Sequence, residues 1–94
     1  MQVSFNAELE NARAYYAIGR VRAFGRWRAA NVPGLEADQR AALRALMREA
    51  AEYGADALTN VSFEFDDVVR ADFDGVPLRR VIAIGSAVRF ALAA

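Results

Sequence analysis

The stretch EAAEYGADALTNVSFEF, from Glu49 to Phe65, is where a helical pattern gives way to an alternating strand within a few residues. An apolar stripe at three- and four-residue steps ends at Gly54, and glycine favours the left-handed conformation that ends many helices. From about Leu58 apolar and polar side chains alternate, as they do along a half-buried strand. The chain therefore joins a helix to a strand by a short connection.

The helix is predicted to span residues 35–53. On another of its faces Arg40, Arg44 and Arg48 form a row, and the i,i+4 pairs Glu36–Arg40 and Arg48–Glu52 are expected to add a little stability. The apolar stripe consists of Leu35, Ala42, Leu43, Leu46, Met47, Ala50 and Tyr53.

Three strands flank this helix in the sequence. The first lies within 14–28, where arginines alternate with small or apolar residues, and Trp27 is expected on the face opposite the arginines. The second runs from about Leu58 to Val69 and the third from about Leu78 to Leu92. A hairpin over 70–77, with Asp74-Gly75 as its turn signal, joins them.

The third strand is apolar on both faces, which is typical of a central strand. We therefore predict an α+β fold: a β-α-β-β two-layer unit, with a three-stranded antiparallel sheet of order 1-3-2 and one helix on one face. Residues 1–94 form a single domain in this prediction, with 1–13 as an N-terminal arm or short edge strand. One helix leaves a sheet face uncovered, so a second subunit is expected over Ile82, Ile84, Val88 and Phe90.

Composition excludes several kinds of site. The chain has 94 residues, 55% of them hydrophobic and 26% charged, with no cysteine and no histidine. This rules out disulfides, zinc or copper sites built from those residues, and the commonest general base. The first residues lack a signal-peptide pattern, and no apolar run approaches the ~20 residues that span a bilayer, so we expect a cytoplasmic protein.

The charges are segregated along the chain although their sum is zero. Residues 11–48 are rich in arginine and residues 49–74 in carboxylates. This pattern favours opposite charges that meet within or between subunits. In a head-to-tail ring, Arg20 and Arg22 at one sheet edge are expected to meet Glu64 and Asp66 at the other edge of the next subunit.

The sequence resembles the YbjQ-like family, known as "putative heavy-metal-binding" proteins, within the wider dodecin-like architecture. The resemblance rests on Gly54-Ala55-Asp56-Ala57, on the strand 61–66 and on Ala83-Ile84-Gly85-Ser86-Ala87-Val88, and it covers about residues 42–90. It implies a β-α-β-β unit that assembles into a ring, typically a pentamer, with no established enzymatic activity. We accordingly expect a homo-oligomer of unknown activity that sequesters a ligand or an ion, and not an enzyme.

Other functions compete with this one. An anion or nucleic-acid binding module is one alternative, built on Arg20, Arg22, Arg26 and Arg28 with Phe24 and Trp27 nearby. A nucleic-acid partner is not expected, because the chain is neutral. A flavin-storing ring that uses Trp27 is a further alternative.

Metal and catalytic sites are not expected. The acidic group has only carboxylate ligands, which suit hard cations, and its calcium-loop match fails, so no metal site and no cofactor are predicted. No histidine, cysteine or lysine is present to activate a serine or threonine. The acidic group is Glu64, Asp66, Asp67, Asp72 and Asp74, and the hydroxyl candidates are Ser4, Thr59, Ser62 and Ser86.

Overall fold

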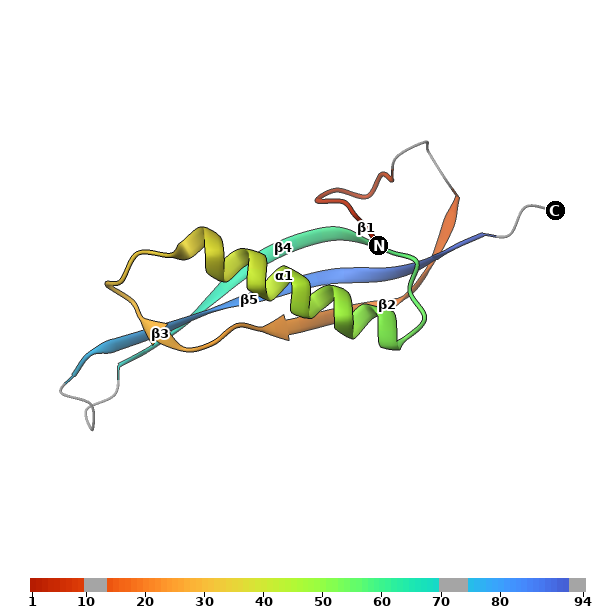
Figure 1. The fold of residues 1–94 in the computed structure, drawn as a ribbon. Helices are drawn as coiled ribbons and strands as arrows, with labels where there is room; N and C mark the ends of the chain where they lie inside the picture. The colour runs from red at the N-terminus through yellow and green to blue at the C-terminus, as the bar shows by residue number, and fades with distance from the viewer. Residues whose placement is uncertain (10–13, 70–74, 92–94) are drawn as a thin grey trace.

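The computed structural model describes residues 1–9, 14–69 and 75–91. One helix lies across one face of a long, narrow sheet (Figure 1). The molecule measures 61 × 20 × 15 Å, and its Cα radius of gyration is 15.9 Å, whereas a compact chain of this length has about 12 Å. In chain order the elements are β1 (Gln2–Val3), β2 (Tyr15–Phe24), β3 (Arg28–Ala29), α1 (Leu35–Glu52), β4 (Ala57–Val69) and β5 (Pro77–Phe90).

The sheet has five strands and is mixed, so the prediction of a three-stranded antiparallel sheet is wrong in detail. The three long strands lie in the order β4-β5-β2, with β5 central. β1 extends the sheet by pairing parallel with the start of β4, and β3 pairs antiparallel with the start of β5. Both added strands have only two residues, too few to show any periodicity in the sequence.

Helix α1 packs on the sheet through the centre of its predicted stripe. Ala42, Leu46 and Ala50 are completely buried, but Leu35 and Tyr53 at the two ends are 48% and 59% exposed. The stripe was therefore predicted too long at both ends. Neither expected ion pair along the helix forms among the described residues.

The helix ends as the glycine predicts. Gly54 has a φ of 77°, its N–H donates to the carbonyl of Ala51, and the Ala55 N–H donates to that of Ala50. This pair of hydrogen bonds is the Schellman arrangement. No helix in the described part of the chain is long and apolar enough to cross a membrane.

The core lies between α1 and the sheet. Alternate residues of β5 face the helix, and Gly85 leaves room for the side chains around it: a Cβ there would lie 3.2 Å from the Val61 side chain and 3.5 Å from that of Leu46. The buried cluster consists of Ala23, Ala42, Leu46, Ala50, Leu58, Val61, Val81, Ala83 and Ala87.

The opposite face of the sheet, here called the helix-free face, is covered differently from our expectation. Ile82 and Ile84 are only 5% and 4% exposed in a single chain. In-register neighbours from both sides flank them: Phe24 and Glu64 beside Ile82, Arg22 and Ser62 beside Ile84. Ile82 and Ile84 therefore do not need a second subunit for their burial, contrary to the prediction.

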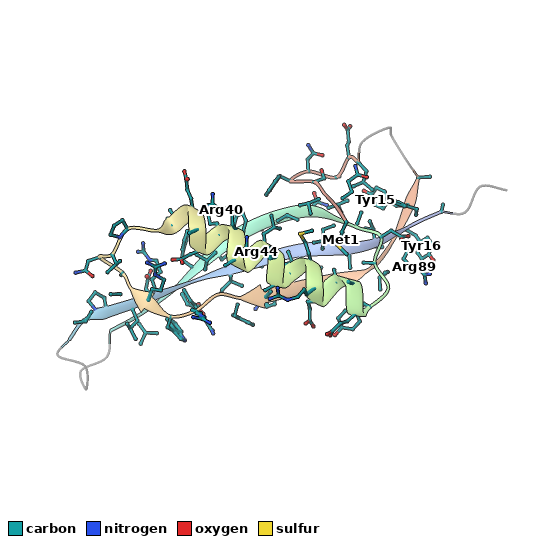
Figure 2. All side chains as sticks on the ribbon, viewed as in Figure 1. Met1, Tyr15, Tyr16, Arg40, Arg44 and Arg89 are labelled. Atoms are coloured by element: carbon teal, nitrogen blue, oxygen red, sulfur yellow. The ribbon has the colours of Figure 1, made fainter. Side chains whose placement is uncertain are left out.

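The N-terminal segment covers one end of the helix-free face. Ser4 exchanges backbone hydrogen bonds with β4, and Leu9 is buried in a cluster with Ala57 and Val88. Tyr15 and Phe90 pack against that cluster, and Tyr16 lies in register with Arg89 beside them (Figure 2).

We predict that Gly85→Val destabilises the fold by about 1–3 kcal/mol, because the added side chain overpacks the contact between α1 and β5. Gly19→Val on β2 is the matched control, since nothing lies within 4 Å of a Cβ at that strand position. Its stability should be unchanged or slightly higher. Urea unfolding followed by circular dichroism measures both. Equal losses for the two variants would contradict the packing assigned to Gly85.

Candidate functional site

The arginines of the first strand do not form one ladder. Arg20 and Arg22 lie on the helix-free face, in register with Ser86 and Ile84. β2 then ends at Phe24. At the next residue, Gly25, the chain comes so close to β5 that the Gly25 N–H donates to the Val81 carbonyl at 2.7 Å.

Arg28, beyond this break, is used to hold α1. Its Nη1 pairs with Asp38 Oδ1 at 2.8 Å, and its Nη2 donates to the Pro33 carbonyl at 3.1 Å. The four arginines therefore do not line one continuous strand face, and an anion or nucleic-acid binding module built on them stays a prediction.

Trp27 also differs from its predicted position. The guanidinium carbon of Arg80 lies 4.3 Å from the centroid of the Phe24 ring and 4.6 Å from that of Trp27. Both rings thus contact one cation, and Trp27 does not point away from Phe24. Arg80 is further held by Asp66, whose Oδ2 lies 2.9 Å from its Nε and 2.8 Å from its Nη2.

The described carboxylates do not fit a heavy metal. Asp66 and Asp67 are adjacent in β4 and point to opposite faces, and Asp67 is held by Arg79 at 2.7 Å. No three potential metal ligands come together in the part of the chain that is described. Heavy metals prefer thiolate and imidazole ligands, which the sequence lacks. Asp72 and Asp74 lie outside the described residues.

The hydroxyl candidates occupy structural positions. Ser4 Oγ donates to the Glu8 carbonyl at 2.6 Å and so shapes the N-terminal segment. Thr59 is 1% exposed within β4, just before a bulge at Asn60, whose φ is 51°. Ser62 and Ser86 lie on the helix-free face beside Ile84 and Arg20. None of these hydroxyls lies next to a general base in the described structure.

Opposite charges lie at opposite edges of the helix-free face. Arg20 and Arg22 belong to β2, Glu64 and Asp66 belong to β4, and β5 separates them. Asp66 is already paired with Arg80, whereas Glu64 has no ion pair among the described residues. Of the four predicted interface charges, three are therefore available for a contact outside the chain.

A groove runs between α1 and the side of the sheet formed by β2 and the residues after it; we call it the α1–β2 groove. It contains three adjoining hollows of about 410, 530 and 580 Å³. Arg48 lines the last two, and Arg26 lines the largest. From the sequence, Arg48 was assigned only to the row of arginines on one face of the helix. The small residues Ala41 and Ala45 on the same side of α1 were the signal for a hollow there.

The residues that carry the family resemblance have structural roles. Gly54 ends α1, and Asp56 Oδ2 accepts a hydrogen bond at 2.8 Å from the Phe90 N–H at the end of β5. Ala57 is completely buried. The model of the YbjQ family, described as "Putative heavy-metal-binding", matches residues 19–91. The chain belongs to this family. Comparison with curated proteins gives no match.

We predict that Zn²⁺ and Cu²⁺ bind weakly and without defined stoichiometry, because the available ligands are carboxylates and two of them are paired with arginines. Calorimetric titration measures this. A stoichiometric sub-micromolar site would contradict the prediction, and the same titration of Asp66→Asn and Asp67→Asn would then show whether these carboxylates form it.

Proposed function

We propose that this YbjQ family member is the subunit of a closed homo-oligomeric ring, with a pentamer favoured by the family resemblance, and that it sequesters a ligand without catalysing a reaction. The family is described by binding and not by a reaction.

The shape of the chain supports assembly. Its accessible surface is 6336 Å², whereas a folded monomer of its mass exposes about 5,400 Å². A long sheet covered by a single helix has a high ratio of surface to volume. Burying part of this surface between copies would bring the protein closer to the surface-to-volume ratio of an ordinary domain.

The observation that carries the proposal is the pair of open sheet edges with opposite charge. β2 pairs only with β5, and from Ser62 onward β4 also pairs only with β5 among the described strands. Open edges present unpaired backbone groups that invite another strand. A head-to-tail contact would bring Arg20 and Arg22 of one copy to Glu64 of the next, and repetition around an axis would close a ring.

Exposed apolar side chains lie along the same edges. Ile18 and Phe24 of β2 are 38% and 47% exposed, and Phe65 and Val68 of β4 are 43% and 38% exposed. These residues would supply most of the affinity, because exposed ion pairs contribute only about 0–1 kcal/mol each. The charges would fix register and partner choice. Ile82, Ile84 and Val88 would contribute less than predicted, since one chain already buries them.

We predict that Arg20→Glu with Arg22→Glu weakens assembly by about tenfold or more, because like charges then meet at the joined edges. Glu64→Arg in the same chain should partly restore it. Asp66 is left unchanged because it holds Arg80 within the chain. Arg44→Glu, on the exposed surface of α1 (Figure 2), is the control and should assemble normally.

Light scattering and native mass spectrometry across a salt series measure the subunit number of each variant. A wild-type monomer at micromolar concentration would contradict the proposal as a whole. Assembly that resists the arginine reversal, or no recovery with Glu64→Arg, would contradict the edge pairing while leaving another interface open.

A further inference from the structure

Phe5 is the most exposed aromatic side chain in the part of the chain that is described. It is 63% exposed, and its ring is tilted against that of Phe63, with 6.4 Å between the ring centroids. Both rings border a small hollow that also contains Leu43 of α1, so Phe5 lies on the helix side of the sheet. A single chain therefore leaves a large apolar group at this edge mostly in water.

An apolar hollow lies at the opposite edge of the sheet, also on the helix side. It is the 410 Å³ hollow of the α1–β2 groove, here called the Gly19 hollow. Ile18 and Val21 of β2 and Tyr53 of α1 line it, and Gly19 leaves it open, since nothing lies within 4 Å of a Cβ there. Tyr53 is 59% exposed. The hollow is thus accessible to an apolar group from outside the chain.

Backbone hydrogen bonds fix the position of Phe5 along the sheet. The residue before it accepts from the Val61 N–H at 3.1 Å, and the residue after it accepts from the Asn60 N–H at 2.9 Å. Val61 packs at Gly85, where a Cβ would lie 3.2 Å from its side chain, and Gly85 is in register with Val21 of β2. Phe5 and Val21 are therefore at the same height on opposite edges of the sheet.

This common height decides which groups meet in a head-to-tail ring. Copies in a closed ring are related by rotation alone, so a group keeps its height in every copy. With strands that run along the axis, Phe5 of one copy then faces the Gly19 hollow of the next. The charged contact proposed above requires the same alignment: Glu64 is level with Phe24 through Ile82, and Phe24 is two residues from Arg22 on the same strand face.

The charges beside these two surfaces are complementary. Glu49 lines the Gly19 hollow, and Arg40 borders the hollow that contains Phe5. Neither has an ion pair among the described residues. Both belong to α1 and so lie on the helix side, where the two surfaces would meet. An exposed pair of this kind adds little affinity, but it disfavours alignments that bring like charges together.

We propose that the Gly19 hollow receives Phe5 of the neighbouring copy, whose ring packs against Tyr53. The proposal rests on the head-to-tail ring proposed above. Aromatic rings pair well in tilted or offset contacts. The hollow is complete only in the assembly, because α1 and β2 come from one copy and the aromatic ring from the next. The N-terminal segment, which occupies the start of the β4 edge, thereby has a function in assembly.

Thiol crosslinking tests the contact directly, because the chain has no cysteine of its own. Phe5→Cys combined with Gly19→Cys places one thiol on each surface. Within one chain these positions lie on opposite edges of the sheet, with β4 and β5 between them (Figure 1), so a short bismaleimide joins them only between copies. We expect a covalent ladder that extends to the subunit number found by native mass spectrometry.

The matched control combines Phe5→Cys with Val32→Cys. Val32 is 50% exposed, but it follows β3, which is level with Leu78 near the other end of the sheet. This pair should give no ladder. Both double variants are crosslinked well above the concentration at which they assemble, because loss of the Phe5 ring weakens the contact.

Truncation measures how much the contact contributes. Phe5→Ala and Tyr53→Ala should each weaken assembly by about tenfold, because each removes an aromatic surface that assembly buries. The double variant should lose less than the product of the two single losses, as residues in contact do. Val32→Ala, which removes an exposed apolar group elsewhere, should assemble normally. Circular dichroism checks that each variant is folded.

The outcomes separate this contact from the ring itself. A wild-type monomer at micromolar concentration would overturn both. A ring in which the thiols at positions 5 and 19 give no ladder, or a ladder that ends at two copies, would overturn the contact alone. Independent losses for Phe5→Ala and Tyr53→Ala would also overturn it. Assembly that depends on Phe5 but resists reversal of Arg20 and Arg22 would support the contact and remove only the charge pairing.

Discussion

The rest of this structure depends on one constraint: the single helix is much shorter than the sheet on which it packs. α1 has 18 residues, a length of about 27 Å, whereas β5 has 14 residues and spans about 46 Å. The helix can bury only the middle of the sheet, where the absence of a side chain at Gly85 leaves room for Leu46. Both ends of the sheet and the helix-free face must therefore be covered by other parts of the chain.

Different devices cover the two ends. At one end the N-terminal segment places Leu9 over Ala57 and Val88. At the other end, arginines take the place of a second helix: Arg79 lies over Phe65 and pairs with Asp67, and Arg80 lies over Phe24 and Trp27 and pairs with Asp66. Arginine suits this role because its planar cation stacks on rings while it binds a carboxylate. Some of the carboxylates that are concentrated in one part of the sequence are therefore paired with arginines of the same chain.

The sequence predicted the elements whose patterns are long and regular, namely α1 and the three long strands, and it predicted the central place of β5 from its two apolar faces. Prediction from the sequence failed where the backbone departs from the regular repeat of a strand. The break at Gly25 moved Trp27 to the same cation as Phe24, and bulges in β2 and β4 shift the pairing register. The α1–β2 groove was missed because Arg26 and Arg48 lie 22 positions apart and only the fold brings them to one hollow.

Membership of the family explains the scaffold of this chain and leaves its ligand chemistry to other residues. Gly54 and Asp56, which carry the resemblance, are used by the backbone: one ends the helix and the other accepts a hydrogen bond from the last residue of β5. A carboxylate in that role has little freedom to bind a metal, and no thiol or imidazole is present to replace it. The residues that carry the scaffold therefore supply no ligand set for a heavy metal. Arg20, Arg22 and Glu64 at the edges, and Arg26 and Arg48 at the groove, are charged residues that have no ion pair within the described chain, so the scaffold does not depend on their charges.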